Sequence, residues 1–179
     1  MTTTVMESTS LSMSDGVTPE MFRQGMTNLA GAVNIVTTPG LNDGVGPAGF
    51  TATAVCSVSD SPATLLVCLN RSASVHEVFK HSKYLAINTL REDQQDLSNI
   101  FGGKAAMVDR FGQGHWQTLL TGSPVLSDAA VSFDCIITDR KSVATHDVLF
   151  CEVLAIKQAA EAGALLYHQR GYRQISSRA

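Results

Sequence analysis

The sequence predicts a mainly β protein, an antiparallel barrel with short flanking helices. About six segments have the length and the apolar or β-branched content of strands, and turn-forming residues separate them. The helical segments between them are short and do not alternate regularly with the strands, which argues against a doubly wound parallel sheet. A chain of 179 residues that is 44% hydrophobic is long enough for one substantial core, so we expect a single domain.

Residues 1–17 are expected to form a disordered tail ahead of a domain that spans residues 18–175. The tail is rich in Ser, Thr and Met and lacks the basic and apolar regions of a secretory signal. Thr18 followed by Pro19 has the pattern of a helix N-cap with proline at the first helical position. Apolar residues then recur at helical spacing, at Phe22, Met26 and Leu29.

Alternating or continuous apolar runs mark the strand candidates. Residues 49–58 alternate most clearly between a core face and a largely hydroxyl-bearing face. The expected core face carries Phe50, Ala52, Ala54, Cys56 and Val58. Residues 63–69 form a nearly continuous apolar run, which is typical of a strand covered on both faces. The remaining candidates are residues 30–38, 84–90, 131–138, 148–156 and 164–168.

Short helices are expected between these strands. Ser74 and Glu77 have capping-box spacing, so one helix is expected to begin at Ser74. A second is expected to begin near Asp93 and to end at Gly102 and Gly103, because a pair of glycines stops a helix. A short helical piece follows at residues 105–111.

Composition and charge exclude several classes of partner. A net charge of −3 without a dense run of Lys or Arg predicts binding neither to nucleic acid nor to an anionic membrane surface. No apolar stretch approaches the roughly 18 residues that span a bilayer. The four cysteines are widely spaced inside apolar runs, which is typical of reduced thiols in a cytoplasmic protein. The His and Cys spacings match no metal site, so no metal is expected.

Two turns are suited to a phosphate group. The segment from Asn70 to Ser74 precedes a helix, so its hydroxyls, its amide groups and Arg71 offer an anion site. Residues 101–104, Phe-Gly-Gly-Lys, combine glycines that let the backbone approach a ligand with a cation. Each turn also has a plain interpretation, the first as an N-cap and the second as a helix stop followed by a solvated lysine.

A third candidate is the titratable pair His146 and Asp147 at the start of a strand, joined by Tyr172 near the end of the chain. A histidine beside a carboxylate can orient a redox ligand or exchange protons with it. The alternative is a turn in which Asp147 caps the backbone and His146 is solvated. The other histidines, among them His76, show no pattern. Motifs of hydrolases and the GxGxxG motif of Rossmann folds are absent.

Several segments together resemble the short-chain flavin reductases that supply two-component monooxygenases, such as the reductase component of 4-hydroxyphenylacetate 3-monooxygenase. The similarity covers residues 22–172 in one order and without large gaps. The cob(II)yrinic acid a,c-diamide reductases are similar as well. The segments that carry the resemblance are GFTATAVCSVSDSPATLLVCLNRSAS, AINTL, LSNIFGGK, TGSPVL, VSFDC, THDVLFCEV and RGY.

The resemblance implies an FMN-binding split β-barrel, a six-stranded antiparallel Greek-key barrel, that forms a homodimer with FMN or FAD in a groove shared by the subunits. The isoalloxazine edge would be lined by Thr51, Ala52, Thr53, Ala54 and Val55. The ribityl chain and phosphate would be served by Asn70, Ser72 and Ser74. That end of the flavin would be closed by Phe101, Gly102, Gly103 and Lys104. The catalytic, nicotinamide-facing positions would be His146, Asp147 and Tyr172.

The implied activity is hydride transfer from NADH, with NADPH as the alternative donor, to FMN or FAD, and reduced flavin is passed to a partner monooxygenase. The first alternative is a flavoprotein that passes electrons to a Co(II) corrin. The second, from another class, is a non-catalytic flavin- or haem-binding split barrel.

Overall fold

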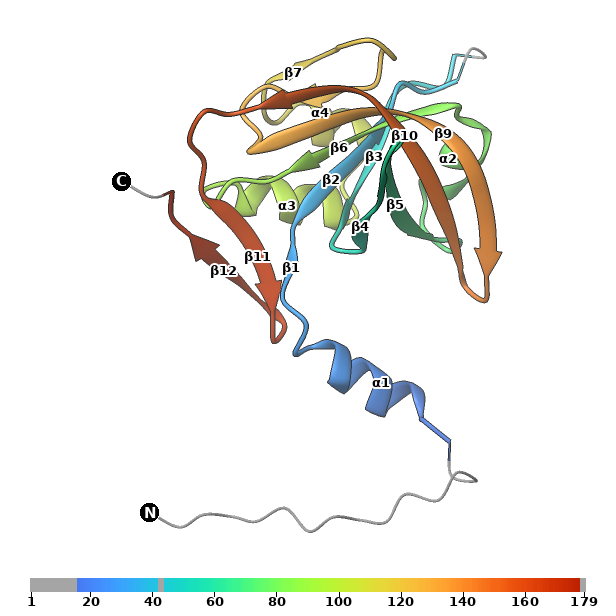
Figure 1. Ribbon diagram of the computed structural model, residues 1–179, viewed down its shortest axis with the longest axis vertical. Coiled ribbons are helices and arrows are strands. Elements are labelled where there is room, and N and C mark those ends of the chain that lie inside the picture. The colour runs from blue at the N-terminus through green and yellow to red at the C-terminus, as the bar shows by residue number, and fades with distance from the viewer. Residues whose placement is uncertain (1–15, 42–43, 178–179) are drawn as a thin grey trace.

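The fold is an antiparallel β-barrel with a smaller three-stranded sheet beside it (Figure 1). The computed structural model describes residues 16–41 and 44–177, and the expected tail at residues 1–17 lies almost entirely outside them. Seven strands form the main sheet in the order β3-β2-β6-β9-β10-β5-β4. They are β2 (Asn34–Thr38), β3 (Ala48–Ala52), β4 (Val55–Asp60), β5 (Ala63–Asn70), β6 (Tyr84–Thr89), β9 (Val131–Val143) and β10 (His146–Gln158).

A bend at Thr53 and Ala54 divides the predicted strand 49–58 into two strands. β3 pairs with β2 at one end of the sheet order, whereas β4 pairs with β5 at the other end. The chain therefore joins the two ends of the sheet. If β3 and β4 are counted as one bent strand, the main sheet has the six strands expected of the barrel. The prediction that Ala54, Cys56 and Val58 lie on the core face is wrong. These residues are exposed, because the backbone changes direction and pairing strand at the bend.

The smaller sheet consists of β1 (Gly31–Ala32), β11 (Ala164–His168) and β12 (Gly171–Ile175). β12 was not predicted. The two-residue turn before it, Gln169 and Arg170, adopts φ values of 49° and 59° without the Asn-Gly sequence that normally marks such a hairpin. A two-stranded ribbon, β7 (Trp116–Gln117) and β8 (Val125–Leu126), completes the strands of the described residues.

Four short helices accompany the strands: α1 (Pro19–Met26), α2 (His76–His81), α3 (Gln95–Gly102) and α4 (Met107–Phe111). The predicted N-cap of α1 is confirmed, because Thr18 Oγ1 accepts a hydrogen bond of 3.1 Å from the Met21 amide. The predicted capping box is wrong. α2 is capped at Val75, one residue after Ser74, without a side-chain hydrogen bond. Gly103 ends α3, as predicted.

The core consists of two clusters of buried side chains. One fills the barrel interior and includes Val36, Val67, Phe79, Leu85 and Leu149. The other packs the outer face of β2 against α3 and the smaller sheet, and it includes Ile35, Leu90, Leu97, Phe101 and Leu165. α3 is thereby held against the barrel, with its last turn beside β3. In the described part of the chain, no helix is long and apolar enough to cross a membrane.

Candidate functional site

A pocket of about 360 Å³ opens where the barrel is split between β3 and β4. The bend after β3, the last residues of β5, the segment before α2 and the end of α3 form its walls. Asn70 at the end of β5 pairs in register with His146 at the start of β10, so both reach the same rim. The sheet register therefore brings together residues that are 76 positions apart in sequence.

Most of the predicted flavin-binding residues line this pocket. With His146, they come from four separate parts of the sequence, and no single strand or helix carries them all. The predicted residues that line it are Thr51, Ala52, Thr53, Ala54, Asn70, Ser74, Phe101, Gly102, Gly103 and His146. Lining residues that sequence reasoning missed are Phe50, Cys68, Leu69, Ala73, Val75 and Arg110.

Five predicted site residues do not line the pocket: Val55, Ser72, Lys104, Asp147 and Tyr172. Ser72 instead closes a local turn, because its amide and its hydroxyl both donate to Asn70 Oδ1 at 2.8 Å. Lys104 is exposed beyond the end of α3. Both residues belong to the segments that were predicted to bind phosphate, but neither lines the cavity.

The end of α3 is pinned against β3 at close range. Thr51 Oγ1 donates to the Ser98 carbonyl at 2.7 Å. A Cβ at Gly49 would lie 2.8 Å from the Phe101 ring, so only glycine lets α3 approach this strand. This packing holds the backbone of Gly102 and Gly103 at the edge of the pocket.

Arg110 organises the loop that follows α3. Its side chain is only 4% exposed. The guanidinium donates to four carbonyls, those of Gly49, Phe101, Gly103 and Ala105, at 2.8–3.0 Å. Among the described residues no carboxylate forms an ion pair with it, so its positive charge is not neutralised. A cation in this position favours an anionic group in the pocket.

The expected pair of His146 and Asp147 does not form, because consecutive residues of a strand point to opposite faces. His146 lines the pocket, and its Nδ1 lies 2.9 Å from Thr145 Oγ1. Asp147 instead pairs with His76 of α2, with 2.7 Å between Oδ2 and Nε2. Hydrogen bonds from Ser142, at 2.6 Å, and from His76 hold the pKa of Asp147 below its usual value. His76 showed no pattern in the sequence.

Tyr172 anchors the smaller sheet to α3. Its hydroxyl lies 2.9 Å from Ser98 Oγ and 2.9 Å from Asn99 Oδ1. Its ring packs edge-to-face against Tyr167 at a centroid distance of 5.3 Å. The tyrosine therefore holds β12 in place and does not reach the pocket.

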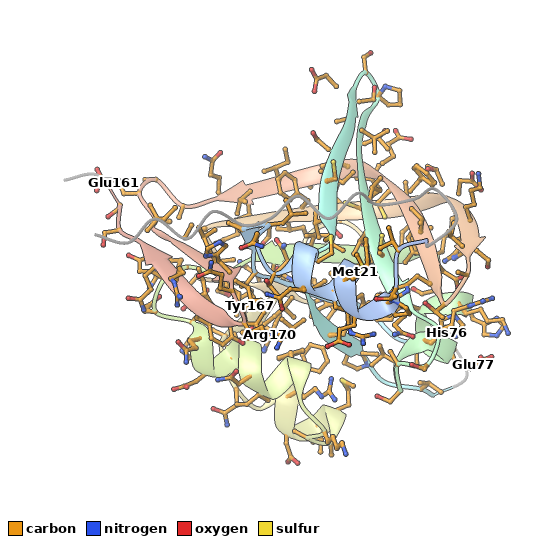
Figure 2. All side chains as sticks on the ribbon, turned by 90° about the horizontal axis from the view of Figure 1, so that it is seen from below. Met21, His76, Glu77, Glu161, Tyr167 and Arg170 are labelled. Carbon is orange, nitrogen blue, oxygen red and sulfur yellow. The ribbon has the colours of Figure 1, made fainter. Side chains whose placement is uncertain are left out.

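A second cavity of about 930 Å³ adjoins the first, and both are lined by Thr53 and Ala54. It lies between α1, β1 and the turn from β11 to β12. Arg23, Arg170 and His168 supply basic groups to its wall, and Tyr167 supplies an aromatic ring. Figure 2 shows Tyr167 and Arg170 near each other in the middle of the view, with His76 farther to the right.

The pocket carries no activated nucleophile. Burial raises the pKa of the Cys68 thiol, so this lining cysteine stays protonated near neutral pH. The site offers a slot with small side chains and hydroxyls, the close backbone of two glycines, an unneutralised cation and an adjoining basic cavity. Such an arrangement is chemically suited to a phosphorylated ligand. The fold and the site together define a class of small antiparallel split-barrel proteins with two adjoining ligand-sized cavities.

The comparisons with known proteins give the family. The model of the flavin reductase like domain matches residues 26–176, and the chain belongs to that family. The chain is 57% identical over 156 residues to the FMN reductase (NADH) RutF of Acinetobacter baylyi, covering 87% of this chain and 81% of that protein. The flavin reductase PheA2 has a solved structure that is 30% identical, with a TM-score of 0.78 over 89% of this chain and 99% of the other.

Asp147→Ala tests the contact between α2 and the turn from β9 to β10. At pH 7 we expect the free energy of unfolding to fall by about 1–2 kcal/mol, since two hydrogen bonds to the carboxylate are lost. The folded pKa of Asp147 is lowered, so its stabilisation is present above the ordinary value near 3.9. That stabilisation is lost as the pH falls through the lower folded pKa.

The measurement is urea unfolding of the wild type and of Asp147→Ala between pH 7 and pH 2.5. Asp60→Ala, at an exposed position on β4, is the control and should stay within about 0.5 kcal/mol of the wild type. If the difference in unfolding free energy between Asp147→Ala and the wild type persists unchanged to the lowest pH, the interpretation is contradicted.

Proposed function

We propose that the protein is an NADH-dependent flavin reductase that transfers hydride to FMN or FAD and supplies reduced flavin to a partner monooxygenase. The observation that carries the proposal is the junction of the two cavities at Thr53 and Ala54. Two flat rings placed in adjoining cavities can be stacked, and hydride transfer requires little more from a protein than that alignment. The relatives that are named for FMN and NADH support the same assignment.

The first cavity fits the flavin. Thr51 to Ala54 line the isoalloxazine edge, where small side chains leave the backbone accessible. Ser74 and the charge of Arg110 serve the phosphate end, beside the backbone of Gly102 and Gly103. A bound flavin supplies the N5 position that accepts hydride from nicotinamide C4. His146 lies on the same cavity and is the one proposed catalytic residue that can contact a bound ring.

The second cavity fits the pyridine nucleotide. Arg23 and Arg170 are placed to pair with its pyrophosphate, and Tyr167 offers a ring for stacking. Arg170 and its neighbour Gln169 occupy the left-handed backbone region, a conformation that L side chains rarely adopt. Such outliers concentrate at functional sites. Asp147 and Tyr172 then act by positioning α2 and β12 rather than by contact with either ligand.

The active form is a homodimer. α1 has eight residues and none is buried, although Met21, Phe22 and Met26 are apolar. Figure 1 shows the helix apart from the barrel. A helix this short is marginal unless its apolar face is packed, so a second copy of the chain is its natural cover. Because Arg23 and Met26 of α1 line the second cavity, the partner would also complete that cavity.

The electron acceptor is free flavin, which leaves in its reduced form for a partner monooxygenase. A Co(II) corrin is the alternative acceptor. A cytoplasmic location fits the four cysteines, which are all free thiols. No contact among the described residues favours a corrin.

The assay that decides the function follows NADH oxidation at 340 nm with added FMN or FAD under air. We expect turnover that saturates in both NADH and flavin. Anaerobic incubation with a Co(II) corrin, with and without free flavin, separates the two acceptors. Protein that neither quenches flavin fluorescence nor oxidises NADH would refute the proposal, and binding without turnover would favour a carrier.

Arg110→Met tests the phosphate end of the flavin site. Loss of the cation should weaken FMN binding by about tenfold or more, equivalent to about 1.4 kcal/mol, because the phosphate loses a charge-assisted interaction. Riboflavin has no phosphate, so its affinity should change much less. The measurement is fluorescence quenching with both ligands. Equal weakening of FMN and riboflavin would show that Arg110 only shapes the loop.

Phe22→Asp tests the dimer. The Phe22 side chain is 60% exposed in the single chain, so a carboxylate there should leave the barrel intact but prevent an apolar contact between subunits. We expect sedimentation velocity to show a dimer for the wild type and a monomer for the variant. Leu120→Asp, on an exposed loop position outside α1, is the control and should remain a dimer. A monomeric wild type would overturn the proposal.

A further inference from the structure

The tight turn between β9 and β10 carries His146 to the rim of the flavin pocket. Val143 pairs with His146, so the turn contains only two residues, Ala144 and Thr145. Figure 1 shows this turn at the free end of the long hairpin. Ala144 has a φ of 49°, a value that an L side chain rarely adopts. Such backbone outliers concentrate at functional sites, so the turn has a shape that its surroundings must enforce.

Arg71, in the segment that follows β5, holds this turn. Its guanidinium donates to the Ala144 carbonyl. Its backbone amide donates to the Thr145 carbonyl at 3.0 Å. The sequence predicted that Arg71 would help to bind an anion, but Arg71 does not line the flavin pocket. One residue thus fixes both carbonyls of the turn that precedes His146.

The Thr145 hydroxyl holds the imidazole ring itself. Thr145 Oγ1 lies 2.9 Å from His146 Nδ1, and this is its only hydrogen bond among the described residues. The nearest carboxylate in sequence, Asp147, points to the opposite face of the strand. Its two oxygens are engaged by Ser142 and His76. The carboxylate therefore does not hold a proton on Nδ1, and the ring nitrogen is the acceptor for the threonine hydroxyl.

We propose that Thr145 and Arg71 are positioning residues that hold His146 as the tautomer with its proton on Nε2. The inference rests on the proposed function and adds to it how the proposed catalytic histidine is prepared. In a neutral imidazole one nitrogen carries the proton, so a hydroxyl that donates to Nδ1 leaves that proton on Nε2. Nε2 is then a fixed donor at the pocket. Hydride transfer places negative charge on the accepting ring, and such a donor stabilises that charge.

Heteronuclear NMR of labelled histidine side chains, in protein without flavin, measures the tautomer directly. At about pH 8.5 histidines of ordinary pKa are neutral, and proton–nitrogen correlations distinguish a proton on Nε2 from one on Nδ1. The His146 signal is assigned by its loss in His146→Gln. We expect a single Nε2–H tautomer in the wild type and a mixture of both tautomers in Thr145→Val. Thr145→Ser, which keeps the hydroxyl, should match the wild type.

Kinetics with NADH and FMN provide the second measurement. Thr145→Val should lower kcat by about tenfold, because a donor that is no longer held in place stabilises the developing charge less well. The Kd for FMN should stay within about twofold, and Thr145→Ser should restore kcat. Arg71→Met should also lower kcat without weakening FMN. Lys141→Met removes an exposed charge from the same hairpin and is the matched control, expected to behave as the wild type.

The outcomes separate this inference from the proposed function. If His146 of the wild type carries its proton on Nδ1, or if Thr145→Val changes neither the tautomer nor kcat, the positioning role is refuted and the flavin reductase remains. If Arg71→Met weakens FMN but not riboflavin, Arg71 binds the phosphate and its role at the turn is wrong. If the wild type oxidises no NADH with either flavin, the proposed function fails, whereas the NMR measurement on the free protein still decides the tautomer.

Discussion

The site depends on one sharp bend of the backbone at Thr53 and Ala54. β3 and β4 lie at opposite ends of the sheet order, so the chain must cross the opening of the barrel between them. The Val55 amide bonds to the Thr53 carbonyl at 3.0 Å, and the Cys68 amide bonds to the Ala54 carbonyl at 3.1 Å. These bonds satisfy backbone groups that a bend would otherwise leave unpaired. The same two residues form the boundary between the two ligand cavities.

A buried cation completes this arrangement. Removing a guanidinium from water is costly, and carbonyl oxygens offset that cost only in part because they carry no full charge. The four carbonyls around Arg110 belong to β3, to the end of α3 and to the loop after it. The side chain therefore fixes the loop geometry and leaves positive potential at the pocket. Arg110 therefore supports the loop, and in the proposed function the same residue recognises the phosphate.

The remaining walls are held by side-chain contacts between elements far apart in sequence. His76 and Asp147 tie α2 to the start of β10, and Tyr172 ties β12 to α3. Ligand-binding groups placed on such supported elements keep their positions better than groups on free loops. The pocket thus takes its precision from residues that do not line it themselves.

Sequence alone determined the β-rich class, most strand positions and the end of α3 at Gly103, because local patterns of apolar and turn-forming residues encode them. Ten of the residues that line the pocket were expected from the family resemblance. Tertiary structure decided the rest. The break in the strand 49–58 depends on which strands pair on each side of it. The partner of Asp147 and the role of Arg110 depend on elements brought together by the barrel, and the hairpin before β12 lacks the usual turn residues. Local sequence does not carry these long-range contacts, since their energy exists only once the chain has folded.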